Sequence, residues 1–148
     1  MSDAEPRLLA AGASSDERGR VYFANDFDLR SCRRMYIVEN FATGTVRAWH
    51  AHRRERKWVL ALTGAALACA VAIDDWESPS RDSQVHRFTL DAEHPAVLEI
   101  PPGFANGAMA LVAQTKLLYL SDASLEQSLQ DDVRFPARYW DPWHVAER

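Results

Sequence analysis

The stretch Gly44-Thr-Val-Arg-Ala-Trp-His50-Ala-His52, followed by Lys57 and Gly64, decides the fold of this chain of 148 residues. The residues after the first glycine are predicted to form a β-strand, and Lys57 is predicted to begin the next strand. Because successive side chains of a strand point to opposite faces, His50 and His52 share one face. Two imidazoles on one face, with a lysine on the neighbouring strand, are the first candidates for chemistry in this sequence.

The spacing of these residues resembles the first metal-binding motif of the cupin barrels, with Lys57 in the place of the metal-binding glutamate. The stretch Pro101-Pro-Gly103-Phe-Ala-Asn106 resembles the second cupin motif, and there Asn106 replaces the fourth ligand, a histidine. Transition metals prefer anionic or imidazole ligands, and an ammonium group among them repels the ion. We therefore expect no metal and no other cofactor, and acid–base chemistry in the barrel interior instead.

Short strand-like runs separated by turn signals extend along most of the chain. The runs predicted as strands are residues 21–24, 34–38, 45–52, 57–63, 65–73, 85–90, 96–100, 108–112 and 115–120. Many short strands between turns are typical of an all-β jelly-roll barrel. Ser124, with Gln127 three residues on, predicts a short helix over 124–129. The aromatic tail 139–143 is expected to pack on the barrel, and we expect a single cupin domain over residues 1–148.

Composition limits the classes of partner. Hydrophobic residues make up 47% and charged residues 26%, and the net charge is −4, whereas a general nucleic-acid binder is usually basic. The longest apolar run, 58–73, is interrupted by Thr63 and Gly64 and is too short to span a membrane. We expect neither nucleic acid nor membrane as a partner. The start of the sequence lacks the pattern of a secretory signal and the two cysteines form no disulfide framework, so a cytoplasmic location is expected.

Each candidate residue has a structural alternative. Paired histidines can be satisfied core residues, and Lys57 can be a solvent-facing charge, because a lysine is almost never fully buried unless it is paired. Tyr119 alternates with Leu117 and Ser121 on a late strand, and its phenol is either a proton donor or a barrel aromatic. Arg47 either binds phosphate through its planar guanidinium or lies on the rim.

Four segments together resemble the nucleotide-sugar cupins. They are Arg47-Ala-Trp-His50-Ala-His52, Lys57-Trp-Val, Ile100-Pro-Pro-Gly-Phe-Ala-Asn-Gly107 and Leu117-Leu-Tyr119. The families in question are the dTDP-4-dehydrorhamnose 3,5-epimerases and the dTDP-4-keto-6-deoxyhexose 3,4-ketoisomerases. The similarity covers most of the chain and includes Asp16-x-Arg18-Gly19 near its start.

The resemblance to the epimerases implies His50 as the general base, Lys57 as the group that stabilises the enolate oxygen and Tyr119 as the acid on the opposite face. The His-Ala-His pattern of the ketoisomerases is also present, which implies His50 and His52 as the proton-moving pair. Substrate-binding residues are expected to be Arg18, Arg47 and Asn106. Two departures are Asn106, where the epimerases have a histidine, and the shorter loop before Lys57.

These features predict a metal-independent isomerase that epimerises C3, C5 or both of a nucleotide-linked 4-keto-6-deoxy sugar. The alternatives are a 3,4-ketoisomerase on the same substrate class and a non-catalytic sugar-binding cupin, which Asn106 makes plausible. A metal-dependent dioxygenase is disfavoured by Lys57 and Asn106. The resemblance also implies a homodimer. The carboxylate that orients the catalytic histidine is expected among Asp131, Asp132 and Asp141.

Overall fold

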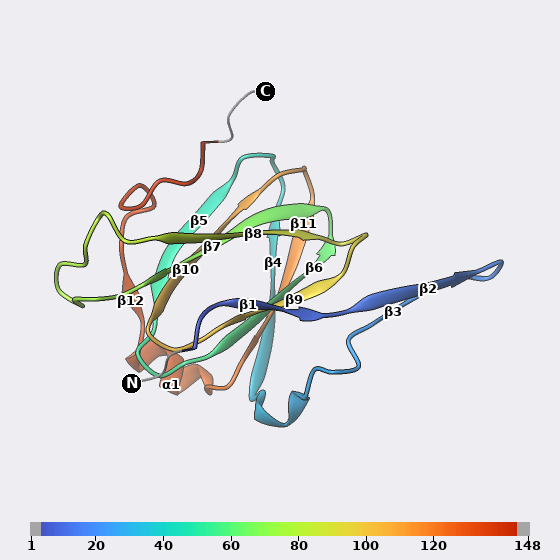
Figure 1. The fold of residues 1–148 in the computed structure, drawn as a ribbon, viewed down its shortest axis with the longest axis horizontal. Helices are drawn as coiled ribbons and strands as arrows, with labels where there is room; N and C mark the ends of the chain where they lie inside the picture. The colour runs from blue at the N-terminus through green and yellow to red at the C-terminus, as the bar shows by residue number, and fades with distance from the viewer. Residues whose placement is uncertain (1–3, 145–148) are drawn as a thin grey trace.

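Two five-stranded antiparallel sheets face each other in the computed structural model, which describes residues 4–144 (Figure 1). The first sheet has the order β1 (Arg7–Ala10), β9 (Ala96–Ile100), β6 (Lys57–Thr63), β11 (Thr115–Ser121) and β4 (Arg34–Asn40). The second has the order β12 (Val133–Arg134), β5 (Val46–Ala51), β10 (Phe104–Ala110), β7 (Ala65–Ala72) and β8 (Val85–Asp91). The predicted all-β jelly-roll barrel is confirmed.

The remaining elements lie outside the two sheets. Strands β2 (Gly12–Asp16) and β3 (Gly19–Phe23) form a hairpin that projects away from the barrel (Figure 1). A 3₁₀ helix, η1 (Leu29–Ser31), precedes β4, and the helix α1 (Leu125–Gln130) follows β11. The capping of α1 agrees with the prediction, because the Ser124 hydroxyl accepts from the backbone of Gln127 while the Gln127 side chain accepts from the backbone of Ser124.

The nine predicted strands are present, and those over 57–63 and 96–100 have the predicted bounds. The prediction for β10 is wrong at its start: the strand begins at Phe104, because the stretch after Gly103 pairs with β7 instead of extending the turn. Strands β1, β2 and β12 were not predicted. They are short, or polar as in Gly12–Asp16, and so lack the apolar alternation that marks a strand.

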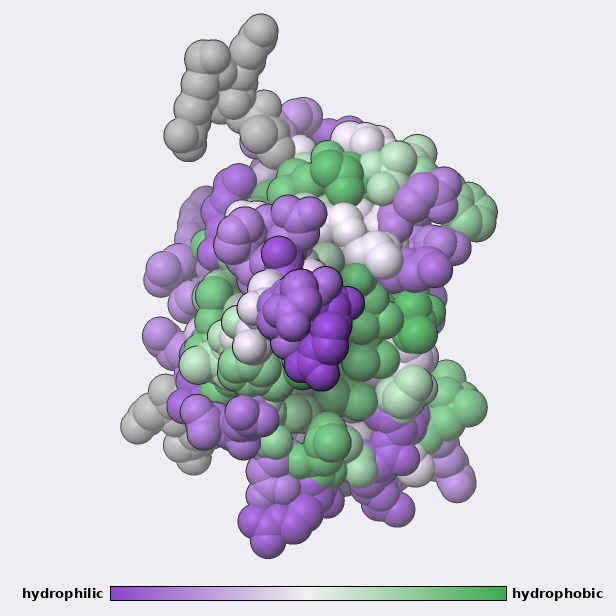
Figure 2. All heavy atoms as spheres, turned by 90° about the vertical axis from the view of Figure 1, so that its right-hand side faces the viewer, coloured by the Kyte–Doolittle hydropathy of each residue, from purple (hydrophilic) through white to green (hydrophobic). Residues whose placement is uncertain are grey.

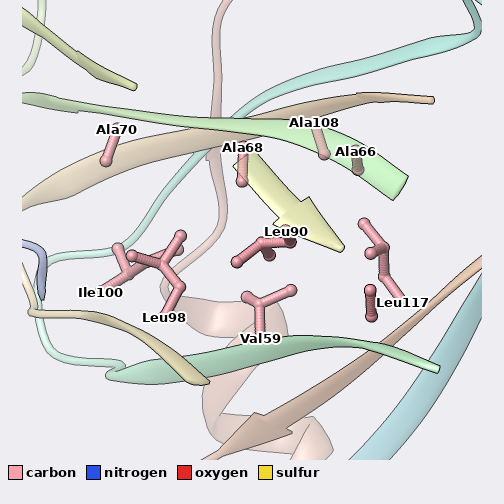
Figure 3. Packing of buried hydrophobic residues seen from close by; sticks show 10 residues of the cluster. Val59, Ala66, Ala68, Ala70, Leu90, Leu98, Ile100, Ala108 and Leu117 are labelled. Carbon is pink, nitrogen blue, oxygen red and sulfur yellow. The ribbon is translucent and has the colours of Figure 1, made fainter. Parts of the chain in front are cut away.

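The main core fills the space between the sheets. Alanines of β7 and β10 face larger side chains of the first sheet, such as Val59, Leu98 and Leu117 (Figure 3). Small residues on one wall opposite large ones on the other let two closely spaced sheets interdigitate without voids. This core is apolar, and the polar interior residues lie beyond it towards one end of the barrel.

A second core lies on the other face of the second sheet. Trp49 is fully buried there against Trp140 and Trp143, and its indole N–H donates to the backbone carbonyls of Ala137 and Trp140 at 3.0 Å each. The prediction that the aromatic tail packs on the barrel is therefore confirmed. The tail covers the outer side of the strand that carries the histidines and so fixes its position. Within residues 4–144, no helix is long and apolar enough to cross a membrane.

Candidate active site

Polar side chains from both sheets meet at one end of the barrel interior. On the second sheet, Asn106 of β10 pairs with His50 of β5. On the first sheet, Tyr119 of β11 pairs with Tyr36 of β4, and Lys57 lies one strand away on β6. These residues continue the inward-facing positions of the main core, because residues two apart in a strand share a face. The inward-facing positions thus change from apolar to polar along each sheet.

A bulge in β5 brings Arg47 and His50 to the same face. Asn106 pairs with His50 and Gly107 with Ala48, so Trp49 is an extra residue in the register. Without it, two residues three apart would point to opposite faces. Arg47 instead reaches the first sheet, where its Nε donates to Oδ1 of Asn40 at 2.8 Å. Only glycine fits at position 107, because a Cβ there would clash with Ala48.

His50 has a carboxylate beside it. Its Nδ1 lies 3.7 Å from Oδ1 of Asp132, an ion-pair distance that is too long for a hydrogen bond. Burial alone would raise the pKa of Asp132, but the hydrogen bond and charge of Arg134, at 2.8 Å, hold it below its usual range. Burial lowers the pKa of His50, and Lys57 lowers it further against the opposing effect of Asp132. A neutral imidazole able to accept a proton is the result.

The three candidate carboxylates have different neighbours. Asp132 lies beside His50. Asp131 accepts from His52 through its backbone carbonyl, at 2.9 Å. Asp141 pairs with Arg138 and His144 in the C-terminal tail. Only Asp132 is therefore placed to orient His50.

Lys57 is only 7% exposed, so the solvent-facing alternative is wrong. Its Nζ donates to the hydroxyl of Tyr36 at 3.0 Å. Burial lowers the pKa of Lys57, whereas the negative charges of Glu55 and Asp132 raise it and Arg34 lowers it. A positive charge at this position has few water molecules to screen it, and its field therefore acts strongly on the neighbouring groups.

Two tyrosines stack beside Lys57. The rings of Tyr36 and Tyr119 are 5.0 Å apart with an interplanar angle of 2°, and Tyr119 packs partly against the main core. Burial raises the pKa of both phenols, that of Tyr36 to about 12, so both remain proton donors at neutral pH. Tyr36 is a site residue that was not predicted from the sequence. Its alternation with Arg34 and Val38 in a predicted strand was the available signal.

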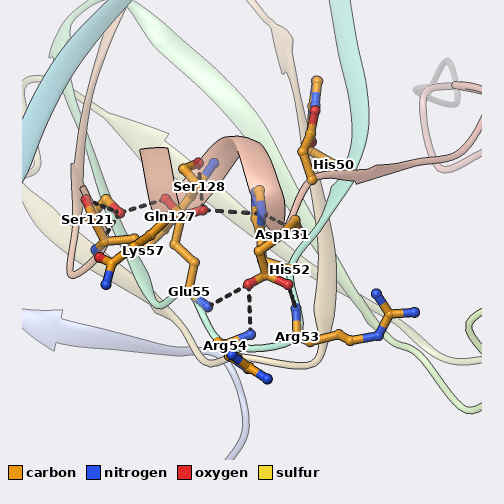
Figure 4. Close-up of polar contacts among 12 residues, drawn as sticks. His50, His52, Arg53, Arg54, Glu55, Lys57, Ser121, Gln127, Ser128 and Asp131 are labelled. Carbon is orange, nitrogen blue, oxygen red and sulfur yellow. Dashed lines mark hydrogen bonds and ion pairs between the residues drawn. The ribbon is translucent and has the colours of Figure 1, made fainter. Parts of the chain in front are cut away.

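His52 belongs to a buried cluster around Glu55 (Figure 4). Its Nδ1 lies 3.1 Å from Oε2 of Glu55 and 2.9 Å from the carbonyl of Asp131. The Asp131 carboxylate accepts from the backbone N–H groups of residues 53, 54 and 55 at 2.8, 2.8 and 3.1 Å. These three hydrogen bonds form a clamp that joins the end of α1 to the loop between β5 and β6. The clamp fixes the position of Asp131 and thereby that of its neighbour Asp132. A cavity of about 420 Å³ lies next to the clamp.

The three predicted substrate-binding residues lie in two different regions of the structure. Arg47 and Asn106 lie near His50, and Asn106 donates from Nδ2 to the His50 carbonyl at 3.1 Å. Arg18 lies at the tip of the projecting hairpin, where its side chain is 84% exposed and pairs with Asp16 at 2.6 Å. The structure does not bring Arg18 to the site of its own chain. Among the described side chains, no group of three or more His, Cys, Asp or Glu residues is arranged to hold a metal ion.

The chain resembles known proteins in sequence and in fold. The sequence model of the dTDP-4-dehydrorhamnose 3,5-epimerase family matches residues 8–139. A search of curated protein sequences gives no significant match.

Solved structures show the same fold. A Mycobacterium tuberculosis rmlC epimerase has a TM-score of 0.75 and 19% identity, over 97% of this chain and 74% of that one. A Bacillus anthracis dTDP-4-dehydrorhamnose 3,5-epimerase with TDP and PPi bound has a TM-score of 0.75 and 21% identity, over 96% and 86%. A Helicobacter canadensis 3,4-ketoisomerase has a TM-score of 0.68 and 15% identity, over 90% and 93%.

These identities are low, so the structures establish the fold, whereas the sequence model establishes the family over most of the chain. The chain belongs to the dTDP-4-dehydrorhamnose 3,5-epimerase family of dTDP-sugar isomerases.

Proposed function

We propose that this protein inverts C3, C5 or both of a dTDP-linked 4-keto-6-deoxy sugar. The C–H bonds next to the 4-keto group are acidic, because loss of either proton gives an enolate. A neutral imidazole is well matched to remove such a proton near pH 7. The residue that supports this role best is His50, since burial lowers its pKa and Asp132 lies beside it.

The buried ammonium of Lys57 is the observation that carries the proposal. It lies among the polar interior residues with its charge aimed at the Tyr36 hydroxyl and away from solvent. A preorganised positive charge stabilises an enolate oxygen, which becomes negative only as the reaction proceeds. Lys57 takes the role of oxyanion partner.

Inversion needs an acid on the face opposite the base. His50 belongs to the second sheet and Tyr119 to the first, so the two side chains approach the interior from opposite walls. Tyr119 delivers the proton that completes inversion. Arg47 binds the diphosphate, and Asn106 holds the backbone of His50 and meets a sugar hydroxyl.

A 3,4-ketoisomerase is the second candidate, and the His52 cluster favours it. His52 has its own carboxylate, Glu55, and lies two residues from His50. Two imidazoles on one wall can remove a proton and return it from the same side to the neighbouring carbon, which moves the ketone without inversion. We nevertheless propose the epimerase first, because Lys57 is placed to act as an oxyanion partner.

The protein also forms a homodimer in this proposal. The outer face of the first sheet carries exposed apolar side chains, including Met35, Ile37 and Leu62. Figure 2 looks onto the side from which the hairpin projects, and hydrophobic residues gather there around its hydrophilic end. A second copy that covers this face would bring its own Arg18 towards the first copy's barrel. A cytoplasmic location is supported by Cys32 and Cys69, which are unpaired within the described part of the chain.

Incubation with dTDP-4-keto-6-deoxyglucose in D₂O, followed by proton NMR, tests the proposal. Deuterium at C3 or C5 with inversion supports the epimerase. A new 3-keto product identifies the ketoisomerase. If calorimetry shows that the nucleotide sugar binds but NMR shows neither deuterium exchange nor a new product, the protein is a sugar-binding protein without this activity.

A further inference from the structure

Glu55 is a buried carboxylate that four groups hold from different elements. Its Oε1 accepts from Ser121 of β11 at 2.5 Å and from Arg34 of β4 at 3.2 Å. Its Oε2 accepts from Ser128 of α1 at 2.9 Å and lies 3.1 Å from Nδ1 of His52. Burial alone would raise the pKa of Glu55, but the Ser121 hydrogen bond and the charge of Lys57 outweigh it and the pKa is lowered. Glu55 is therefore an anion with a fixed orientation.

The surroundings of His52 determine which ring nitrogen carries the proton. Nδ1 faces two groups, the carboxylate of Glu55 and the backbone carbonyl of Asp131, and both can only accept hydrogen bonds. Nδ1 must therefore be protonated. Burial, followed by Lys57, lowers the pKa of His52, so the ring is neutral and its second nitrogen, Nε2, is unprotonated.

Nε2 of His52 is buried and has no hydrogen-bond partner within residues 4–144. A buried acceptor without a donor is costly, and such groups occur at sites with a ligand or a catalytic role. His52 lies two residues beyond His50, and its pKa is lowered by burial and then by the charge of Lys57, so its ring belongs to the polar end of the interior with these two residues.

We propose that Glu55 is a positioning residue that fixes His52 as the Nδ1-protonated tautomer, so that its unprotonated Nε2 accepts a hydrogen bond or a proton from the sugar. The second half of this statement rests on the proposed function, and the first half does not. His50 with Asp132 and His52 with Glu55 form two imidazole–carboxylate pairs on one strand end. The sugar would meet both.

Charged groups from several elements act on His52. They are Glu55 from the loop after β5, Lys57 from β6, Arg34 from β4 through Glu55, Asp131 and Asp132 after α1, and His50 from β5. Glu55 is the strongest influence that raises the pKa of His52. Loss of its charge lowers that pKa further. A base with a lower pKa stays unprotonated to lower pH, so the acidic limb of a pH–rate profile moves to lower pH.

Glu55→Gln tests the tautomer directly. The donors from Arg34 and Ser121 hold the amide oxygen in the place of Oε1, which leaves the amide NH₂ facing His52. An NH₂ group only donates, so it opposes a proton on Nδ1, which only the Asp131 carbonyl then favours, and it shifts the ring proton towards Nε2. Glu55→Asp retains the charge. Glu39→Gln removes a matched carboxylate from the outer face of β4, where it pairs with Lys116 at 3.8 Å.

The measurement is a two-bond ¹H–¹⁵N correlation spectrum of the histidine rings in the protein without substrate, with the His52 signals assigned from a His52→Asn variant. The proposal expects Nδ1–H and unprotonated Nε2 in the wild-type protein and in Glu39→Gln, and a shift towards Nε2–H in Glu55→Gln. A wild-type His52 that is protonated at Nε2 overturns the proposal, even if Glu55→Gln fails to fold.

Activity provides the second readout if the wild-type protein exchanges deuterium. Glu55→Gln should lower kcat by about 10²-fold with little change in KM and move the acidic limb to lower pH, while Glu55→Asp restores the limb. Unchanged kcat with the altered tautomer would overturn the role of Nε2. If the wild-type protein shows no exchange with any sugar tested, the proposed function fails, while the ring spectrum still decides the role of Glu55.

Discussion

At the scale of single residues, burial and the charge of Lys57 act together on the imidazoles of the site. Burial is the larger cause that lowers the pKa of His50 and His52, and Lys57 lowers both further and helps to keep Glu55 ionised. The lowered pKa of the two histidines favours the neutral imidazole, which is the form that accepts a proton, whereas the ionised Glu55 acts against this on His52 by raising its pKa. Burial gives Lys57 this influence, because water screens it weakly.

Lys57→Met retains most of the side-chain stem and removes the charge. If the ammonium stabilises an enolate, kcat should fall by about 10²–10³-fold with little loss of stability. Steady-state kinetics and thermal unfolding measure the two effects. Lys116→Met is the matched control, because Lys116 is half-exposed on β11 and pairs with Glu39. A near-normal kcat for Lys57→Met would remove Lys57 from the mechanism and favour the ketoisomerase.

Tyr119→Phe should spare solvent deuterium exchange and block inversion, because the base remains and the acid on the opposite face is lost. Proton NMR in D₂O separates the two steps. The raised pKa of both phenols means that neither ionises below about pH 10, so inversion should not decline through tyrosine ionisation up to that pH. Tyr36→Phe tests the stacked neighbour in the same assay. Inversion lost in Tyr36→Phe and kept in Tyr119→Phe would assign the acid to Tyr36.

At the scale of elements, the clamp between α1 and the loop before β6 positions both imidazole–carboxylate pairs. The Asp131 carboxylate binds three successive backbone N–H groups, while its carbonyl accepts from His52 and its neighbour Asp132 lies beside His50. The short helix is thus part of the site, although it contributes no side chain that faces the imidazoles directly.

Asp131→Ala should destabilise the fold by roughly 2–3 kcal/mol, because it leaves three backbone donors without a charged acceptor. It should also lower kcat, since Asp132 and His52 lose their fixed positions. Asp75→Ala is the matched control: Asp75 accepts from the backbone of Glu77 and Ser78 in an exposed loop. Chemical denaturation and kinetics check both variants. Equal effects in the two variants would contradict a role for the clamp in the site.

Local pattern predicted most strands and the helix cap. It could not predict that Arg47 lies on the same face as His50, because simple alternation places residues three apart on opposite faces. The bulge that brings them to one face arises from the pairing of β5 with β10, which the local sequence does not reveal. Three of the four partners of Glu55, namely Arg34, Ser121 and Ser128, lie 21, 66 and 73 residues away in sequence. Only the closed barrel brings such distant residues together, so neither Glu55 nor the choice of Asp132 followed from spacing.

At the scale of the whole molecule, one face of the barrel has the character of an interface. Ile37 pairs with Leu118, and Leu118 pairs with Leu60. Each of the three is next in sequence to an inward-facing residue, so its own side chain points outward; these neighbours are Tyr36, Tyr119 and Val59. They therefore form an apolar row across the outer side of three strands. Ile37 is exposed and Leu60 and Leu118 are partly exposed, and contiguous apolar surface of this kind is typical of protein–protein contacts.

Ile37→Asp places a charge in the middle of that row. If a second copy covers the face, the carboxylate must be buried without a partner, and the dimer dissociation constant should rise by at least about 100-fold. Light scattering coupled to gel filtration over a range of concentrations measures the change. Leu129→Asp is the control, because Leu129 is an apolar residue on α1, outside the row, and is 68% exposed against 51% for Ile37. Activity adds a further test: if Arg18 acts in the site of the other copy, the monomeric Ile37→Asp protein and an Arg18→Ala dimer should both lose substrate affinity. A wild-type protein that is monomeric and active would place the whole reaction within one barrel and leave Arg18 without a role.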